Sequence, residues 1–198
     1  YEFTDHNPVA RVMQAMLTAL EGSNLESETE ALAEFYESVR LRAAGIDNAE
    51  GKQRVITELY EKFFRLAFPR SADALGIVYT PTQIVDFILR SVNDLLVTEF
   101  GTTISAPGVH VLDPFTGTGT FITRLLASGL IAPEDLARKF TSELHANEIT
   151  LLAYYIAAAN IEATFHDLTA SFAADAVAPA SADPRAWVPF VGIVLADT

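Results

Sequence analysis

Cysteine is absent from this chain of 198 residues, and tryptophan occurs only once. Without cysteine there are no disulfides and no thiolate metal ligands, which fits the cytoplasm as the expected location. No run of eighteen apolar residues is present, so no membrane span is expected. The first residues, Tyr1–His6, do not form a basic region followed by an apolar stretch, so no secretion signal is expected.

Basic residues are scarce as well. Thirteen lysines and arginines stand against 26 aspartates and glutamates, which gives a net charge of −13. From Ser71 onward, five bases stand against fourteen acids. Because phosphate contacts dominate affinity for duplex DNA, a domain that binds DNA by itself is usually basic. The composition therefore predicts that this chain alone binds DNA poorly. The four histidines are scattered without metal-ligand spacing, so no metal site is expected.

The most informative feature present is the stretch from Val109 to Leu126. It reads as a strand ending at Asp113, a turn containing Gly117 and Gly119, and a helix, which together form the entry unit of a nucleotide-binding α/β sheet. A pyrophosphate site calls for backbone N–H groups without a carboxylate at the strand end. A ligand with a cationic amino group calls for the carboxylate, so this pattern favours S-adenosylmethionine over NAD.

Two commoner nucleotide motifs are excluded by single positions. The dinucleotide fingerprint needs a small residue three positions after its second glycine, and Ile122 occupies that position. The phosphate loop of NTPases needs lysine after its last glycine, and neither glycine is followed by lysine. For the two glycines taken alone, an ordinary tight turn remains the alternative.

Three segments carry a family resemblance. Asp113-Pro-Phe-Thr-Gly-Thr-Gly-Thr-Phe121 resembles the cofactor-binding motif of N6-adenine DNA methyltransferases. Upstream, Tyr79-Thr-Pro-Thr-Gln-Ile-Val-Asp-Phe-Ile88 resembles the segment that precedes this motif, and Asn147-Glu148-Ile149 with the 151–161 helix resembles the next one. The motif order and the helical preamble are similar to single-chain (type I-like, type ISP) restriction–modification enzymes.

The resemblance implies S-adenosylmethionine as cofactor and an adenine-specific DNA methyltransferase as the parent protein. It also implies helicase-like and nuclease domains on the parent polypeptide, with DNA bound through regions outside this chain. The family's catalytic Asn/Asp-Pro-Pro-Tyr/Phe string does not occur here, so this fragment is expected to bind cofactor without methylating. An RNA or protein methyltransferase fragment and a non-catalytic scaffold module remain the alternatives.

The expected fold class is α/β, with an N-terminal helical bundle followed by an incomplete doubly wound (Rossmann-like) methyltransferase sheet. The boundaries expected are residues 1–70 for a helical, coupler-like domain and 71–198 for the N-terminal, cofactor-binding part of a methyltransferase domain. In the first part, apolar spacing predicts helices over residues 9–20, 32–41 and 55–66.

In the second part, Thr80 is expected to cap a helix that has Pro81 at its first position and a broad buried apolar face. The other elements expected are strands over 109–113, 143–148 and 190–196, helices over 120–128, 133–138 and 151–161, and loops over 101–108 and 173–184. The helix over 151–161 is apolar on nearly all sides and is expected to be sandwiched.

The residues expected to bind the cofactor cluster after the first strand. Asp113 is assigned to the cofactor's amino group, the alternative being a cap on the following turn. Gly117 and Gly119 let the backbone approach the ligand. Thr116 and Thr118 offer hydroxyls, and Phe115 is a candidate wall of the pocket.

A second set follows the other elements. Glu148 is expected to accept both ribose hydroxyls, the alternative being a solvated surface glutamate, and Ile149 to cover one face of adenine. Glu148 lies 35 residues after Asp113, which is longer than the roughly twenty of the dinucleotide pattern. Tyr79 and Thr80 suit the cofactor's carboxylate at a helix N-terminus, although a simple cap would explain Thr80 equally well. Asp197, after the third strand, resembles a residue that approaches either the cofactor adenine or the edge of the target base.

Overall fold

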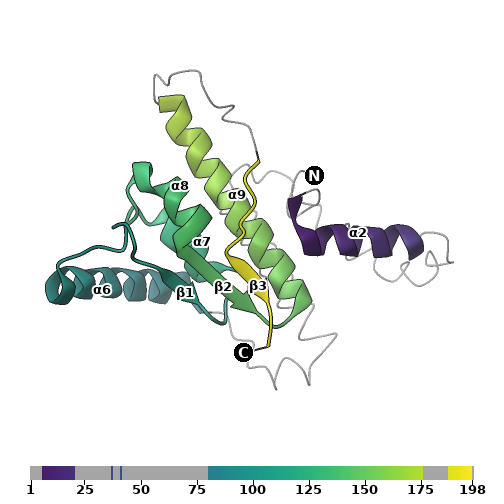
Figure 1. Cartoon of the computed structure of the whole chain (residues 1–198), viewed down its shortest axis with the longest axis horizontal. Coiled ribbons are helices and arrows are strands. Elements are labelled where there is room, and N and C mark those ends of the chain that lie inside the picture. Colours follow the sequence, from purple (N-terminus) through teal and green to yellow (C-terminus); the bar gives the residue numbers. More distant parts are fainter. Residues whose placement is uncertain (1–5, 21–36, 38–40, 42–79, 176–186, 198) are drawn as a thin grey trace. The chain divides into compact units, whose positions relative to one another are not determined.

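The computed structural model describes residues 6–20, 37, 41, 80–175 and 187–197 (Figure 1). The chain divides into two compact units, Tyr1–Ile77 and Val78–Thr198. The helix predicted over 55–66 and Tyr79 lie outside the described residues, as does nearly all of the helix predicted over 32–41.

In the first unit the structure describes helix α2, Pro8–Leu20, which confirms the helix predicted from apolar spacing. Asn7 begins it. Its Oδ1 accepts hydrogen bonds from the backbone N–H groups of Val9 and Ala10, both at 3.0 Å. A side-chain acceptor at this position satisfies N–H groups that have no partner inside the helix.

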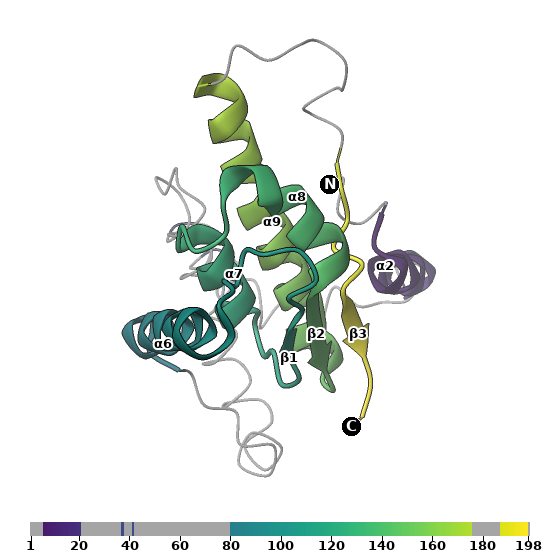
Figure 2. The ribbon, with the colours of Figure 1, turned by 60° about the vertical axis from the view of Figure 1, so that its left-hand side comes forward.

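The second unit contains a three-stranded parallel sheet in the order β1-β2-β3 (Figure 2). The strands are β1 (Val111–Asp113), β2 (Leu144–Glu148) and β3 (Ile193–Leu195). All three were predicted, and each begins later than the apolar pattern suggested. Because the strands are parallel, their carboxyl ends meet at one edge of the sheet, where ligand sites of such sheets lie.

Helices cover one face of this sheet. Leu144, Ala146 and Ile193 are buried on the face against which α9 (Leu151–Asp175) packs, and α9 in turn contacts α7 (Thr120–Ala127). Figure 2 shows α9 behind the three strands. On the opposite face Leu112 is 64% exposed and Val194 53%. A doubly wound sheet has helices on both faces, whereas helices cover one face of the sheet within the described residues. The incomplete doubly wound arrangement therefore stays a prediction.

Helix α6 (Thr82–Phe100) packs against α7 and ends at Gly101, whose φ of 62° is left-handed. Arg124 of α7 holds it through two hydrogen bonds to Asp86, at 2.8 and 2.7 Å. The broad buried face predicted for this helix is wrong. Val85 and Leu89 are buried, whereas exposed apolar side chains include Ile84, Phe87, Val92, Leu95 and Phe100. Helix α7 covers too narrow a strip of α6 to bury a stripe this wide.

The connection between α7 and β2 contains the short helix predicted over 133–138, here η1 (Pro133–Asp135) and α8 (Leu136–Arg138), and a π-helical turn, η2 (Lys139–Glu143). Lys139 is fully buried, and its Nζ donates to the carbonyls of Ala106 and Val109 at 2.9 and 2.6 Å. Its Nζ also lies 2.8 Å from a carboxylate oxygen of Glu143, which holds the pKa of Glu143 near 2. This network fastens the loop before β1 to the end of η2.

Helix α9 is more than twice as long as the helix predicted over 151–161 and extends into the segment expected to be a loop from Ala173. Alanine favours helix strongly, which fits the continuation of the helix over Ala173–Asp175, the first residues of the predicted loop. The rest of that loop up to residue 184 lies outside the described residues. The middle of α9 is buried on nearly all sides, as predicted.

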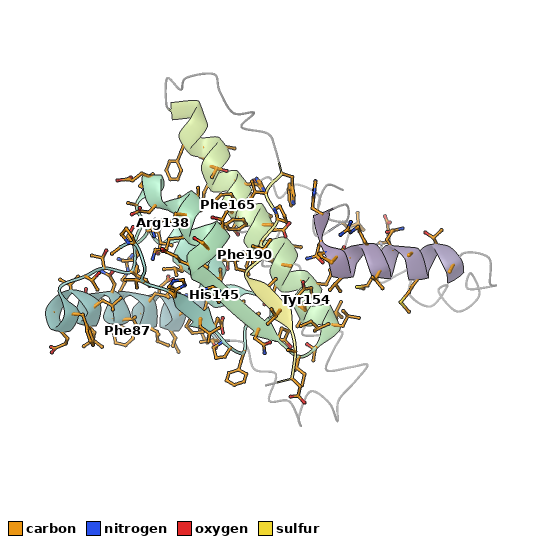
Figure 3. All side chains as sticks on the ribbon, in the orientation of Figure 1. Phe87, Arg138, His145, Tyr154, Phe165 and Phe190 are labelled. Carbon is orange, nitrogen blue, oxygen red and sulfur yellow. The ribbon has the colours of Figure 1, made fainter. Side chains whose placement is uncertain are left out.

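Aromatic rings pack where α9 meets the segment leading to β3. Phe165 of α9 stacks on Phe140 with ring centroids 3.8 Å apart, and the ring centroid of Phe190 lies 5.2 Å from that of Phe140. Figure 3 shows Phe165 and Phe190 at this place. Among the described residues no helix is both long and apolar enough to cross a membrane.

Candidate functional site at the carboxyl edge of the sheet

Two carboxylates stand at the ends of neighbouring strands. Asp113 pairs with Ala146 across the sheet, and Glu148 lies two residues beyond Ala146, so alternation places both acids on the same face. Burial raises the pKa of Asp113; the Thr116 hydroxyl and the Phe115 N–H oppose this shift, and the negative charge of Glu148 adds to it. A desolvated carboxylate beside a second acid is stabilised by a cation.

Asp113 is engaged by the turn that follows it. Its Oδ1 accepts the Phe115 N–H at 3.3 Å, and its Oδ2 accepts the Thr116 hydroxyl at 3.1 Å. These bonds are the turn-capping role that was the alternative for Asp113. They do not exclude a ligand, because each carboxylate oxygen has two lone pairs and each accepts one of these bonds.

Glu148 is 8% exposed, which excludes a solvated surface glutamate. Its Oε2 accepts the Gly117 N–H at 2.9 Å. Its Oε1 accepts the backbone N–H and the hydroxyl of Thr150, at 2.8 and 2.7 Å. Glu148 therefore joins the glycine turn after β1 to the start of α9.

The turn itself is held from several directions. The Thr116 N–H donates to the carbonyl of Asn147 at 3.0 Å, and the Gly119 N–H donates to the carbonyl of Thr116 at 2.9 Å. Asn160, buried in α9, donates from Nδ2 to the carbonyl of Thr118 at 3.0 Å. The backbone between Pro114 and Gly119 is thus fixed by groups from β2 and α9, which is the preorganisation a binding loop needs.

Gly117 and Gly119 have different surroundings, so glycine is needed at the two positions for different reasons. Both have positive φ, 56° at Gly117 and 86° at Gly119. A Cβ on Gly119 would lie 3.2 Å from the Cα of Ala157 and 3.2 Å from the side chain of Ile161, both on α9. A Cβ on Gly117 would meet nothing within 4 Å. The close approach made at Gly119 is therefore to α9, whereas Gly117 faces open space beside Glu148.

The remaining predicted residues fall into two groups. Phe115, Ile149 and Asp197 form the exposed group. Phe115 is 80% exposed and Ile149 48%, so both leave apolar surface at this edge of the sheet. Asp197 is exposed after β3. Thr116 and Thr118 are buried. The Thr116 hydroxyl is already donated to Asp113.

At the start of α6 the predicted cap is wrong. Pro81, rather than Thr80, is the N-cap, and no side-chain capping bond is formed. The Pro81 carbonyl accepts the N–H groups of Ile84 and Val85 at 2.9 and 3.1 Å. The proline therefore lies one position earlier than predicted, which moves Thr80 outside the helix.

Sequence reasoning missed the two asparagines that hold the turn. Asn160 is a polar residue inside an alanine-rich apolar helix, and Asn147 lies on the central strand next to Glu148. A polar residue at a buried position needs a hydrogen-bond partner, and that need was the signal that could have identified both. Their partners are backbone carbonyls far away in sequence, which no local pattern reveals.

The structure thus defines an α/β protein with a parallel sheet, and two carboxylates and a glycine turn form a candidate site at the carboxyl edge of that sheet. Residues 1–51 match the family model described as "Type ISP restriction-modification enzyme, coupler domain". This match confirms the predicted resemblance to single-chain restriction–modification enzymes for that part of the chain. No curated protein sequence matches the chain.

Three solved structures are similar over nearly the whole chain. The "ATP-dependent Type ISP restriction-modification enzyme LlaBIII bound to DNA" has 47% identity and a TM-score of 0.72, covering 96% of this chain and 12% of its own. A nuclease-deletion mutant of the Type ISP enzyme LlaGI, in complex with a DNA substrate mimic, has 46% identity and a TM-score of 0.73, covering 98% and 15%. The DrdV-DNA complex has 34% identity and a TM-score of 0.82, covering 98% and 18%. The chain therefore spans less than a fifth of each of these proteins.

Proposed function

We propose that residues 71–198 form the S-adenosylmethionine-binding part of an adenine-N6 DNA methyltransferase within a Type ISP restriction–modification enzyme. The observation that carries this proposal is the pair of carboxylates, Asp113 and Glu148, on one face at the carboxyl ends of β1 and β2. Between them lies a glycine turn whose backbone is held by hydrogen bonds from both sides.

The chemistry of this site fits the methyl donor better than it fits a phosphate ligand. Two neighbouring carboxylates repel the anionic phosphates of NAD or ATP, and Asp113 is already destabilised as an anion by burial and by Glu148. S-adenosylmethionine brings an ammonium group and a sulfonium, both cationic. It also brings two ribose hydroxyls, which a carboxylate accepts.

Each candidate residue then has a definite role. Asp113 would hold the ammonium group and Glu148 the ribose hydroxyls, which requires Glu148 to exchange its Gly117 bond for a hydroxyl. The exposed apolar side chains of Phe115 and Ile149 would cover the adenine. When bound, the cofactor supplies an electrophilic methyl group, and the contribution of this chain is to orient it. Thr80 and Asp197 remain candidates for the carboxylate and the adenine edge.

The substrate proposal comes from the relatives and from charge. Each of the three similar structures is described as bound to DNA or to a DNA substrate mimic. This chain carries a net charge of −13, so the DNA contacts are assigned to regions outside it. The helicase-like and nuclease domains of the parent polypeptide are proposed as its partners within the same enzyme.

Calorimetry with the whole 198-residue chain tests the proposal. We expect S-adenosylmethionine to bind and NAD to give no signal. Asp113→Asn should weaken binding at least about tenfold, because the charge that faces the ammonium group is lost. The matched control is Asp94→Asn, which removes one negative charge from an exposed position on α6 and should leave affinity unchanged. Equal affinity of the Asp113→Asn variant and the unsubstituted chain would overturn the assignment.

A further inference from the structure

Asn147 connects the carboxyl ends of all three strands. Its own strand is β2, and its Nδ2 donates to the carbonyl of Pro114, just after β1, at 3.3 Å. The same Nδ2 donates to the carbonyl of Ala196, just after β3, at 3.2 Å. Its backbone carbonyl accepts the Thr116 N–H at 3.0 Å. Every proposed ligand-binding residue at this edge lies within a few residues of one of these bonds.

The orientation of this amide is fixed by its partners. If Nδ2 and Oδ1 exchanged places, the oxygen would face two carbonyl oxygens and both bonds would be lost. In the observed orientation Oδ1 is buried and has no hydrogen-bond partner among the described residues, while the side chain as a whole is 6% exposed. An unpaired buried acceptor is unfavourable for folding, so stability alone does not account for an asparagine here.

We propose, resting on the function proposed above, that Asn147 is a positioning residue of the methyl-donor site. Its two amide protons set the spacing between the turn that begins at Pro114 and the chain after β3. That spacing places Phe115 and Gly117 on one side of the ligand and Asp197 on the other. Asn147 lies on the sheet face opposite Asp113 and Glu148, so it acts through backbone position and without touching their carboxylates.

Two substitutions separate positioning from stability in the whole 198-residue chain. Asn147→Leu removes both donors and leaves the carbonyls of Pro114 and Ala196 without this partner, so its melting temperature should fall. S-adenosylmethionine should bind at least about tenfold more weakly, which is more than that loss of stability explains. Asn147→Asp should bind as weakly at pH 8, because an ionised carboxylate repels the two carbonyls. Burial beside two carbonyl oxygens should raise the pKa of the Asn147→Asp carboxyl. At pH 6 part of the loss should then be recovered, because a protonated carboxyl can donate one hydrogen bond.

The unsubstituted chain is measured at both pH values, which removes the effect of the other titratable groups near Asn147. These are Asp113, Glu148 and Asp197 at this edge, and His145, on the same sheet face as Asn147, with His110 in contact with it. The stability control is Asn93→Ala, which deletes a hydrogen bond of 3.0 Å to the Ile104 N–H, far along α6. It should lower the melting temperature without changing affinity.

The possible outcomes are distinguishable. If the unsubstituted chain binds S-adenosylmethionine and both Asn147 variants bind it as tightly as that chain does, the positioning role is wrong and the proposed function stands. The affinity losses of Asn147→Leu and Asn93→Ala are compared per degree of melting temperature lost. If the two ratios are equal, Asn147 is merely structural and the inference is overturned. If the unsubstituted chain does not bind S-adenosylmethionine, both the proposed function and the inference about Asn147 are wrong. Should Asn147→Asp not fold at pH 8, the leucine variant decides.

Discussion

Gly119→Ala tests how the glycine turn is packed against α9. The new Cβ would lie 3.2 Å from the Cα of Ala157, 3.2 Å from the side chain of Ile161 and 3.3 Å from the carbonyl oxygen of Ala157. Two of these three neighbours are backbone atoms of α9, whose helical hydrogen bonds prevent them from moving apart easily. The φ of 86° at Gly119 is also one that alanine rarely adopts.

The expected cost is the sum of two terms. The left-handed backbone costs a residue with a Cβ about 1–2 kcal/mol. Forcing one methyl group into a well-packed contact costs about 1–3 kcal/mol. Gly119→Ala should therefore lower the free energy of unfolding by about 2–5 kcal/mol, a large share of the roughly 5–15 kcal/mol that stabilises a typical domain.

Gly117→Ala is the matched control, because its Cβ would meet nothing within 4 Å and its φ of 56° is left-handed too. Only the cost of the left-handed backbone applies to Gly117→Ala, so the free energy of unfolding should fall by about 1–2 kcal/mol. Urea unfolding followed by circular dichroism measures both variants. Calorimetry should rank the two variants in the opposite order. Gly117→Ala should weaken S-adenosylmethionine binding more than Gly119→Ala does, and by more than its loss of stability explains. Equal stability losses at the two glycines would refute the packing of Gly119 on α9.

The other predictions concern the segment that leads into β3. Burial raises the pKa of Glu162 to about 7, against the hydrogen bonds from Phe190 N–H and Trp187 Nε1 that favour its ionised form. Its stabilising contribution is therefore full below about pH 4.5 and lost as pH rises toward 7. Urea midpoints should fall across this window, and Glu162→Gln should flatten the decline; an unchanged slope would contradict the assignment. Gly192→Ala would place a Cβ 2.1 Å from the Leu144 carbonyl oxygen, so β3 should detach from β2, at a cost of more than about 2 kcal/mol. Faster hydrogen exchange of the Ala146 amide, which donates to the Gly192 carbonyl, would report the detachment.

Local patterns were sufficient to predict the order and type of the elements in the second unit. The strand ending at Asp113, the turn with two glycines and the helix after it were all predicted from spacing and are all present. Glu148 was placed correctly at the end of the second strand. These features depend on the conformations that neighbouring residues allow one another, so they are encoded within short stretches of sequence.

Long-range contacts decided the rest. Spacing predicted a broad buried face for α6, yet burial depends on what packs against the helix, and only Val85 and Leu89 of α6 are buried. Lys139 reads as a surface base, but it is fully buried because the carbonyls of Ala106 and Val109, 33 and 30 residues away, accept its ammonium protons.

For the candidate site, the sequence by itself determined the two acids and the glycine turn, because motif spacing and strand alternation are local properties. Only the tertiary structure decided that Gly119 is needed against α9, and that Asn147 and Asn160 hold the turn. The physical reason is the same in each case. A hydrogen bond or a steric limit between residues tens of positions apart exists only after the sheet has brought those residues together.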